Sequence, residues 1–197
     1  TTEYGRLLTA TNAAITPYTA LQGALSVACG RLSYTFGFSG PSYTVDTACS
    51  SSLVSMHLAS KMLVNEESDS GIAGGVQLFL IPQPFVVLLM SNMLAADGRC
   101  KTLDQTADGY VRAEACGFSV VKSADDAILS ALVQVCGSAV NQDGRSSSLT
   151  APNGPSQQAV IWRSVNYAGM RLDQYVQHEM HGTGTPLGDP IEVGAAC

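Results

Sequence analysis

The sequence has few charged side chains and lacks the features of several protein classes. Charged residues make up only 13% of the 197 residues, and ten basic against sixteen acidic residues give a net charge of −6. No cluster of lysine and arginine is present to neutralise a phosphate backbone, which argues against nucleic-acid binding. The longest apolar run, residues 85–90, is far shorter than the ~20 residues of a membrane-spanning helix. We therefore expect no nucleic-acid partner and no membrane span.

The six cysteines contain no CxxC pair and no spacing typical of a small disulfide-bonded domain. In a chain that is 46% hydrophobic, we expect them to be reduced thiols of an intracellular, cytoplasmic protein. The chain begins at Thr1 without a methionine and stops at Cys197, inside an expected helix. We therefore expect a fragment of a longer protein, in which organelle targeting is not excluded.

The hydrophobic periodicity alternates between strand and helix spacing along the chain. Helices are predicted at residues 21–32, 50–64 and 157–168, and strands at residues 42–47, 71–81, 117–122, 131–140 and 175–180. Such alternation favours a layered α/β fold, which we expect to form one compact unit. The helix over 50–64 is apolar on nearly every side, which predicts that it is buried in the middle of the domain.

Cys49 lies between the predicted strand over 42–47 and the predicted helix over 50–64. Backbone N–H groups and the positive end of the helix dipole would favour its thiolate form there. The same N–H groups could stabilise an oxyanion on an attacked thioester. A free cysteine is more often a small buried side chain, and position alone leaves Cys49 open between these roles. For Cys29, Cys100, Cys116 and Cys136 we expect the buried role.

His181 opens the glycine-rich loop HGTGT, where close approach of a ligand is possible. Imidazole can act as a base or a hydrogen-bond donor near neutral pH, and the hydroxyls of Thr183 and Thr185 could bind a polar, extended substrate. The following DPIE has the pattern of a helix start. We therefore predict structural roles, with Asp189 as the N-cap and Glu192 at the third helical position.

Two other strings in this region are near matches to ligand-binding motifs. The string HEMH, residues 178–181, is one residue shorter than the metalloprotease motif HExxH. Residues 182–188 are as glycine-rich as a phosphate-binding loop but lack its spacing and its lysine. We predict no metal site.

Four blocks carry a family resemblance: GRLSYTFGFSGPSYTVDTACSSSL (30–53), GRCKTLDQTADGYVR (98–112), GSAVNQDGRSSSLTAPNGPSQ (137–157) and HGTGTPLGDPIE (181–192). In this order and spacing the chain resembles the ketosynthase domain of type I polyketide synthases, within the β-ketoacyl synthase family of the thiolase superfamily. The resemblance implies an α/β, thiolase-like α-β-α-β-α layered fold. Residues 1–197 would then be one partial domain, truncated at both ends, that covers the N-terminal half and the start of the C-terminal half.

The resemblance also implies a decarboxylative Claisen condensation in polyketide or fatty acid biosynthesis. Cys49 matches the nucleophile that takes an acyl group from a carrier-protein thioester, and its N–H matches one oxyanion donor. His181 matches the first of two histidines that promote malonyl decarboxylation. Thr183 and Thr185 match the threonines that bind the phosphopantetheine arm. No bound cofactor is implied, and the implied partners are an acyl carrier protein, acyl and malonyl thioesters, and a second copy of the parent.

The chain departs from the family pattern in three respects. The second histidine, a lysine and the second oxyanion donor would lie beyond Cys197, so we expect this chain alone to be inactive. Its missing sheet partners would leave apolar surface exposed, so we also expect it to be poorly soluble. Residues 112–115 read Arg-Ala-Glu-Ala where the family usually has Arg-Gly-Glu-Gly, and methyl groups on Ala113 and Ala115 are expected to strain a tight backbone. The segment 123–132 is shorter than usual, which indicates a trimmed surface loop.

Two alternatives to a condensing enzyme remain. A non-catalytic partner subunit would explain the alanines at 113 and 115, although such partners usually lack the nucleophile. A thiol hydrolase could use Cys49 with His181, but the other blocks do not fit it. The sequence does not predict the starter and extender units, the chain length of the product or the neighbouring domains.

Overall fold

The computed structural model describes residues 2–124 and 131–197, which form two compact units. The first unit contains residues 1–83 and 114–131, and the second contains residues 84–113 and 132–197. This division differs from the one compact unit expected from the sequence, and the assignment of residues 1–197 to one partial domain stays a prediction. The expected trimmed loop over 123–132 lies largely at residues 125–130, outside the described residues.

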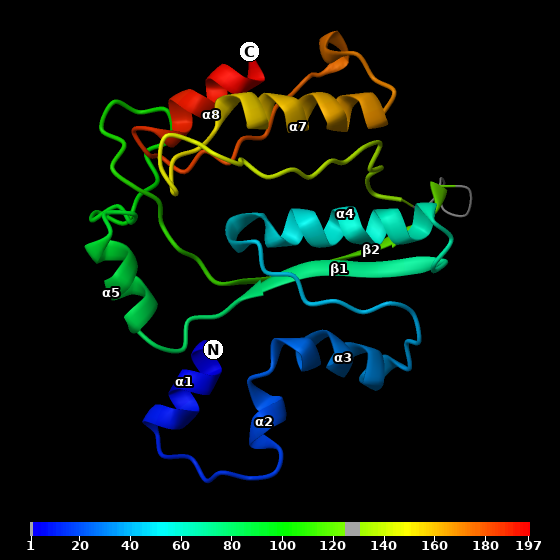
Figure 1. The fold of residues 1–197 in the computed structure, drawn as a ribbon, viewed down its shortest axis with the longest axis vertical. Coiled ribbons are helices and arrows are strands. Elements are labelled where there is room, and N and C mark those ends of the chain that lie inside the picture. Colours follow the sequence, from blue (N-terminus) through cyan, green and yellow to red (C-terminus); the bar gives the residue numbers. More distant parts are fainter. Residues whose placement is uncertain (1, 125–130) are drawn as a thin grey trace. The chain divides into compact units, whose positions relative to one another are not determined.

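The first unit begins with short helices whose ends follow from the sequence (Figure 1). These are α1 (Glu3–Ala10), α2 (Thr19–Gln22) and α3 (Leu25–Phe36). The hydroxyl of Thr2 accepts a hydrogen bond from Gly5 N at 3.2 Å and caps α1. The helix predicted over 21–32 is divided between α2 and α3, because α2 ends at its C-cap Gly23.

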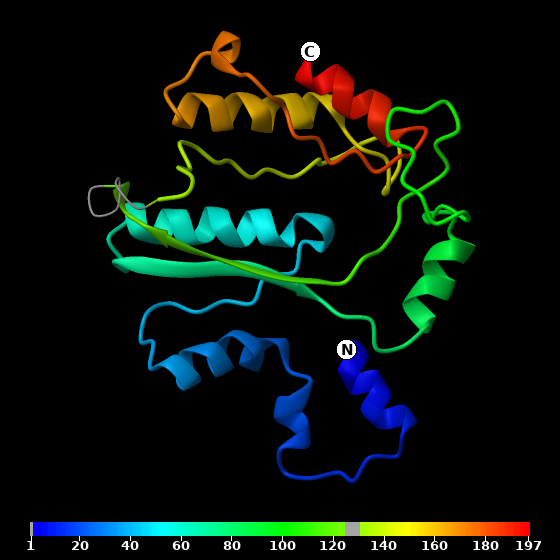
Figure 2. The same ribbon diagram turned by 180° about the vertical axis from the view of Figure 1, so that it is seen from behind.

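A two-stranded antiparallel ribbon and the helix α4 (Ser51–Val64) form the centre of the first unit. Strand β1 (Ser70–Gln77) pairs with β2 (Ala115–Lys122), so that Ser70 lies opposite Lys122. The two opposite views in Figures 1 and 2 show that α4 lies along this ribbon. A side chain at Gly75 would overlap the Ser52 hydroxyl, so glycine in β1 permits this close approach.

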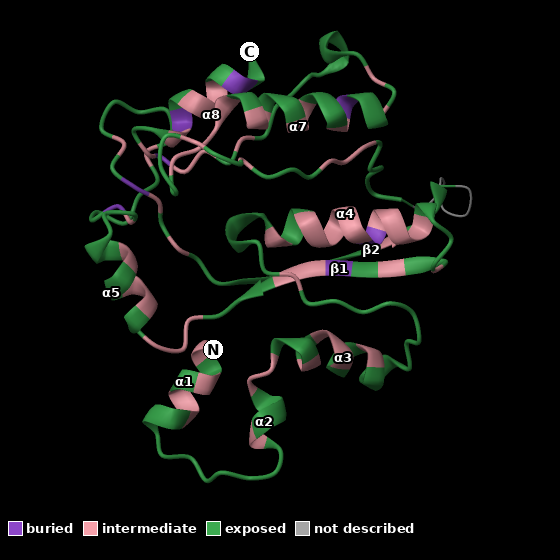
Figure 3. Ribbon diagram, in the orientation of Figure 1, coloured by how far each residue is buried: buried purple, intermediate pink, exposed green. Residues whose placement is uncertain are grey.

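The core of this unit is small, and it lies between α4 and β1. Ala59 of α4 and Ala73 of β1 are buried there (Figure 3). The prediction of a buried helix over 50–64 is wrong in this structure, because Ala59 is the buried residue of α4 and residues 54–63 around it are otherwise half-buried. Leu53 and Val64 at its ends are 77% and 75% exposed.

Strand β1 ends earlier than the predicted segment 71–81, because carboxylates bind the next backbone amides. The Glu3 carboxylate accepts from Leu80 N at 2.9 Å and from Ile81 N at 3.4 Å. The Glu114 carboxylate accepts from Phe79 N at 2.6 Å. These amides are therefore paired with side chains instead of a strand.

The strands predicted over 42–47, 131–140 and 175–180 are not formed. Each segment is irregular, and within residues 2–124 and 131–197 none pairs with a neighbouring strand. A period-two pattern specifies alternating faces, but a strand also needs a partner for its N–H and C=O groups. The prediction over 117–122 is confirmed by β2.

The second unit contains α5 (Gln83–Met90), α7 (Gly154–Tyr167), the 3₁₀ turn η2 (Leu172–Gln174) and α8 (Gly188–Ala196). Helices α7 and α8 pack together, with Val165 and Ala195 buried (Figures 1 and 3). The helix predicted over 157–168 is confirmed as α7, and its N-cap is Asn153, whose side chain accepts from Ser156 N at 3.3 Å. Among the described residues, no helix is long and apolar enough to cross a membrane.

Candidate functional site

Cys49 is exposed in the 3₁₀ turn η1 (Ala48–Ser50), directly before the helix α4. The prediction that a helix follows Cys49 is confirmed, while the strand expected before it is not formed. Ala48 has a φ of 56°, in the left-handed region that a residue with a side chain rarely adopts. Its N–H donates to the Asp46 carboxylate at 3.1 Å. Cys49 thus follows a sharp bend that turns the chain into the helix.

Hydroxyl groups of the same motif hold this turn. Thr47 N donates to Ser51 Oγ at 2.9 Å, and Ser51 Oγ donates to Ala48 O at 2.7 Å. The hydroxyls of Thr47 and Ser50 lie 2.9 Å apart in a further hydrogen bond. Ser50 is the N-cap of α4, so Cys49 directly precedes the positive end of the helix dipole. Such a position suits a nucleophilic thiolate and a developing oxyanion.

The loop with His181 lies in the second unit, and Glu192 of α8 binds its first two amides. One carboxylate oxygen accepts from His181 N at 2.5 Å and the other accepts from Gly182 N at 2.9 Å. This bidentate contact fixes the backbone at His181, whose side chain is exposed.

Asp189 binds the other half of the loop and is only 3% exposed. Its Oδ1 accepts from Gly184 N at 3.0 Å and Thr185 N at 3.4 Å, and its Oδ2 accepts from Leu103 N at 2.8 Å. The prediction of Asp189 as N-cap is wrong, because α8 begins at Gly188 with Leu187 as its N-cap. Both carboxylates bind backbone amides of the preceding loop instead of capping their own helix. Their role is therefore structural, but it consists of tertiary contacts.

The two threonines of the loop contact each other. Thr183 Oγ1 and Thr185 Oγ1 lie 3.1 Å apart, and Thr185 Oγ1 also accepts from Gly188 N at 3.1 Å. Thr183 and Thr185 are both half-buried. Their binding of a pantetheine arm stays a prediction, and any ligand must share hydroxyls that already bond within the loop.

A segment distant in the sequence also contacts the histidine loop, and its residues carried no signal of this role. Thr102 Oγ1 donates to Gly182 O at 2.5 Å, and Gly109 N donates to Gly184 O at 3.0 Å. We call residues 97–109 the brace loop. Apart from Asp97, its sequence belongs to the block GRCKTLDQTADGYVR, and its only local signals are the turn dipeptides Asp97-Gly98 and Asp108-Gly109.

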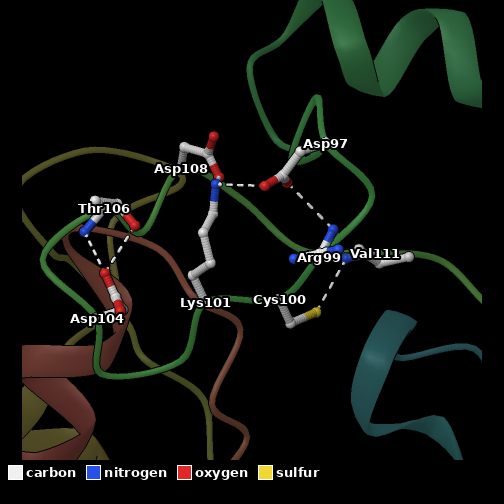
Figure 4. A network of polar contacts seen from close by, with 8 residues as sticks. All are labelled: Asp97, Arg99, Cys100, Lys101, Asp104, Thr106, Asp108 and Val111. Atoms are coloured by element: carbon white, nitrogen blue, oxygen red, sulfur yellow. Dashed lines mark hydrogen bonds and ion pairs between the residues drawn. The ribbon is translucent and has the colours of Figure 1, made fainter.

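Lys101 bridges two parts of the brace loop (Figure 4). Its ammonium lies 2.6 Å from Asp108 Oδ1 and 3.3 Å from Asp97 Oδ2, and the Lys101 side chain is 20% exposed. The hydrogen bond to Asp108, with that to Asp97, raises the pKa of Lys101 above its ordinary value. Desolvation raises the pKa of Asp97, but hydrogen bonds from Lys101 and from Arg99 N outweigh it, so the pKa lies below its ordinary value.

A turn within the brace loop is closed by a third carboxylate. Asp104 Oδ1 accepts from both the N–H and the hydroxyl of Thr106 at 2.7 Å (Figure 4). These two hydrogen bonds lower the pKa of Asp104. The carboxylate is therefore favoured in its charged form, which keeps the turn closed.

The block NQDG, residues 141–144, contacts the start of α7. Asn141 Nδ2 donates to Ser156 O at 2.7 Å, and Asn153 Nδ2 donates to Asp143 O at 2.8 Å. The Asp143 carboxylate accepts from Asn153 N at 3.2 Å. This block holds the start of α7, and α8 packs on α7. Its contacts therefore stabilise the histidine loop indirectly, through the two helices.

The remaining cysteines differ from the sequence-based expectation. All six cysteines are free thiols. Cys29 is half-buried, and Cys100, Cys116 and Cys136 are exposed, so the buried role predicted for these four is wrong. Hydrogen bonds with the hydroxyls of Ser42 and Thr44 lower the pKa of Cys29. In the part of the chain that the structure describes, no three histidine, cysteine or acidic side chains group as metal ligands.

Comparison with protein-family models gives two matches in the chain. The beta-ketoacyl synthase N-terminal domain matches residues 1–127, and the beta-ketoacyl synthase C-terminal domain matches residues 132–197. Cys49 falls within the first match and His181 within the second.

Curated proteins similar to the chain are polyketide synthases. One component of the phenolphthiocerol/phthiocerol polyketide synthase of Mycobacterium tuberculosis is 49% identical over 169 residues, which are 84% of this chain and 8% of that protein. Polyketide synthase GfsB of Streptomyces halstedii is 50% identical over 173 residues, which are 86% of this chain and 3% of that protein. The chain therefore spans a small part of these relatives.

Solved ketosynthase structures share the fold. The ketosynthase from module 6 of the bacillaene synthase of Bacillus subtilis is 39% identical with a TM-score of 0.82, over 87% of this chain and 31% of that one. The oxazolomycin ketosynthase domain of Streptomyces albus is 32% identical with a TM-score of 0.87, over 95% of this chain and 32% of that one. The chain spans about a third of these structures.

Proposed function

Because the chain belongs to the beta-ketoacyl synthase family and has its thiolase-like α/β fold, we propose that residues 1–197 are part of a polyketide synthase ketosynthase domain that condenses acyl units. The observation that carries this proposal is an exposed Cys49 in a strained turn at the start of α4, within a chain that matches both halves of the family. Both family matches make a thiol hydrolase the weaker explanation.

In the proposed first step, the Cys49 thiolate attacks the carbonyl of an acyl thioester on an acyl carrier protein. A new thioester forms at Cys49, the carbon–sulfur bond to the carrier breaks, and the phosphopantetheine sulfur leaves as a thiolate that takes a proton from water. Cys49 directly precedes the N-terminus of α4, and the turn exposes its sulfur to the incoming arm. The Cys49 N–H would stabilise the tetrahedral oxyanion.

In the second step, a malonyl thioester loses CO₂ and its α-carbon attacks the carbonyl of the Cys49 thioester. The carbon–carbon bond forms, the carbon–sulfur bond to Cys49 breaks, and the Cys49 thiolate is regenerated. His181 would donate a hydrogen bond to the thioester oxygen that becomes negative on decarboxylation. Glu192 and Asp189 hold the loop backbone while this charge develops.

The phosphopantetheine arm would lie along Thr183 and Thr185, whose hydroxyls supply donors and acceptors. The arm arrives on the carrier protein, so no resident cofactor is part of the proposal. We further propose a cytoplasmic, homodimeric parent protein, in line with the free thiols and the bacterial relatives.

A non-catalytic partner role has no structural support at the two unusual alanines. Neither Ala113 nor Ala115 has a positive φ, and both side chains are exposed. The prediction that their methyl groups strain the backbone is therefore wrong. Ala115 instead pairs with Gln77 in the ribbon.

Acyl loading tests the proposed function in the full-length protein that carries this chain. We expect a radiolabelled or mass-detected acyl group on Cys49, no loading of a Cys49→Ala variant, and normal loading of the matched Cys116→Ala variant. A His181→Ala variant should load normally but release CO₂ from malonyl thioester far more slowly. Equal loading of the Cys49→Ala variant would refute the proposal.

A further inference from the structure

The brace loop, residues 97–109, contacts the histidine loop at two points within the second unit, and at a third point it contacts Asp189 of α8, which itself binds that loop. Thr102 binds the carbonyl of Gly182, Gly109 binds the carbonyl of Gly184, and Leu103 N binds the Asp189 carboxylate. The first two contacts hold the loop carbonyls, whereas Asp189 and Glu192 hold its amides. The brace loop therefore binds carbonyl groups of the histidine loop, and the carboxylates of α8 bind its N–H groups.

The two backbones also lie in direct contact at Gly184. This residue has a φ of 69°, and a Cβ there would lie 2.8 Å from Lys101 N and 3.2 Å from Gly109 O. A shift of the brace loop at Lys101 therefore moves the wall against which the histidine loop rests.

The shape of the brace loop depends on a single cation between two carboxylates. Lys101 Nζ contacts Asp108 near one end of the loop and Asp97 at the other (Figure 4). Without the ammonium, two negative charges would face each other with no cation between them, and their repulsion would open the loop. Thr102 and Leu103 directly follow Lys101, so they would move with it.

We propose that Lys101 is a positioning residue for His181, acting through the brace loop. Its ion pairs close the loop and thereby hold Thr102, Leu103 and Gly109 against the histidine loop. The predicted effect on decarboxylation rests on the proposed function. The predicted effect on hydrogen exchange in the brace loop does not depend on it. We thus assign catalytic relevance to a side chain that contacts neither the substrate nor His181.

The test compares Lys101→Met with wild type in the full-length protein, since methionine keeps the length and removes the charge. We expect about tenfold slower decarboxylation of malonyl thioester, from a displaced imidazole, with unchanged acyl loading of Cys49. Hydrogen exchange should become at least about tenfold faster at the amides of Leu103, Gly109 and Gly184, which donate the bonds described above. A uniform loss of loading and decarboxylation would indicate general unfolding and overturn the positioning role.

Two control variants test whether the effect depends on the position and on the positive charge of Lys101. Arg171→Met removes another ion pair of the same unit, the one with Asp173, whose side chains are 79% and 63% exposed, and should leave both steps unchanged. Lys101→Arg should recover most of the decarboxylation rate by restoring the cation.

A triple variant tests the repulsion directly. Replacing Asp97 and Asp108 by asparagine in the Lys101→Met background removes the facing charges and should recover part of the exchange protection and of the rate. No recovery, or unchanged exchange in Lys101→Met, would overturn the inference. If wild type neither loads nor decarboxylates, the proposed function fails, and the exchange measurement still decides whether Lys101 holds the brace loop.

Discussion

The turn at Cys49 and the loop at His181 are held in opposite ways. Every hydrogen bond described at the Cys49 turn joins residues between 46 and 51, through hydroxyls, a carboxylate and backbone of the same motif. The His181 loop is held by carboxylates of α8 and by Thr102, which lies 80 residues from Gly182 in sequence. One site is therefore built locally, and the other is assembled by the fold of its unit.

This difference predicts how far the structural effect of a substitution spreads from its site. A local turn loses one hydrogen bond, and its neighbours rearrange within a few residues. A loop wedged between a helix and a distant segment has backbone on both sides, which cannot yield as a side chain can. Substitutions at the histidine loop should therefore cost more and reach further.

The largest effect is expected for Gly184→Ala. Its φ of 69° disfavours any side chain, and a Cβ would lie 2.8 Å from Lys101 N, a backbone atom. We expect the local opening free energy of residues 101–109 and 181–185 to fall by about 3 kcal/mol in native-state hydrogen exchange. Gly194→Ala is the matched control, because a Cβ there meets nothing within 4 Å in α8 and should stabilise by about 0.5–1 kcal/mol. Equal effects of the two would contradict the wedged geometry.

Asp189→Asn should have the next largest effect. The buried carboxylate accepts three N–H groups, and an amide would turn one of its oxygens into a donor facing another donor. We expect the opening free energy at Gly184 and Leu103 to fall by about 2 kcal/mol in hydrogen exchange. Asp173→Asn, at an exposed ion pair of the same unit, should change it by less than about 0.5 kcal/mol. A change confined to α8 would instead support the capping role predicted from the sequence.

The same contrast explains which parts of the site could be predicted from the sequence. The Cys49 turn and the start of α4 depend on neighbours in the chain, so spacing and small side chains were sufficient. Asp189 and Glu192 fit the pattern of helix caps, and that local pattern cannot show that both carboxylates reach the loop instead. The role of Lys101 depends on Asp97, Asp108 and a distant backbone, for which one sequence has no signal.

The elements of the fold follow a similar rule. Helices α4 and α7 were predicted because periodicity and caps are local features. The segment 78–81 continues the apolar pattern of β1, yet its amides bind Glu3 and Glu114, and no pattern reveals that competition. Strand patterns over 131–140 and 175–180 likewise specify faces but not a partner.

Ser51→Ala tests the local side of the comparison with an intermediate effect. It removes the acceptor of Thr47 N and the donor to Ala48 O, so we expect a loss of about 1 kcal/mol in the opening free energy at the start of α4. Exchange at residues 101–109 should not change. Ser60→Ala, whose hydroxyl bonds back to Met56 O within α4, should be nearly neutral. Faster exchange in the brace loop would show that the Cys49 turn is not local.

Ala48→Gly should have the smallest effect and the opposite sign. The φ of 56° costs an L-residue roughly 1–2 kcal/mol, which glycine does not incur, while the added freedom of an unfolded glycine costs about 0.4–1 kcal/mol. The difference predicts stabilisation of the turn by about 0.5 kcal/mol, measured as slower exchange at the start of α4. Ala10→Gly, at the last residue of α1, incurs the glycine cost without relieving a strained φ and should destabilise. If both variants destabilise alike, the bend before Cys49 stores no strain, and its exposure of the thiol depends on the hydroxyls of Thr47 and Ser51 alone.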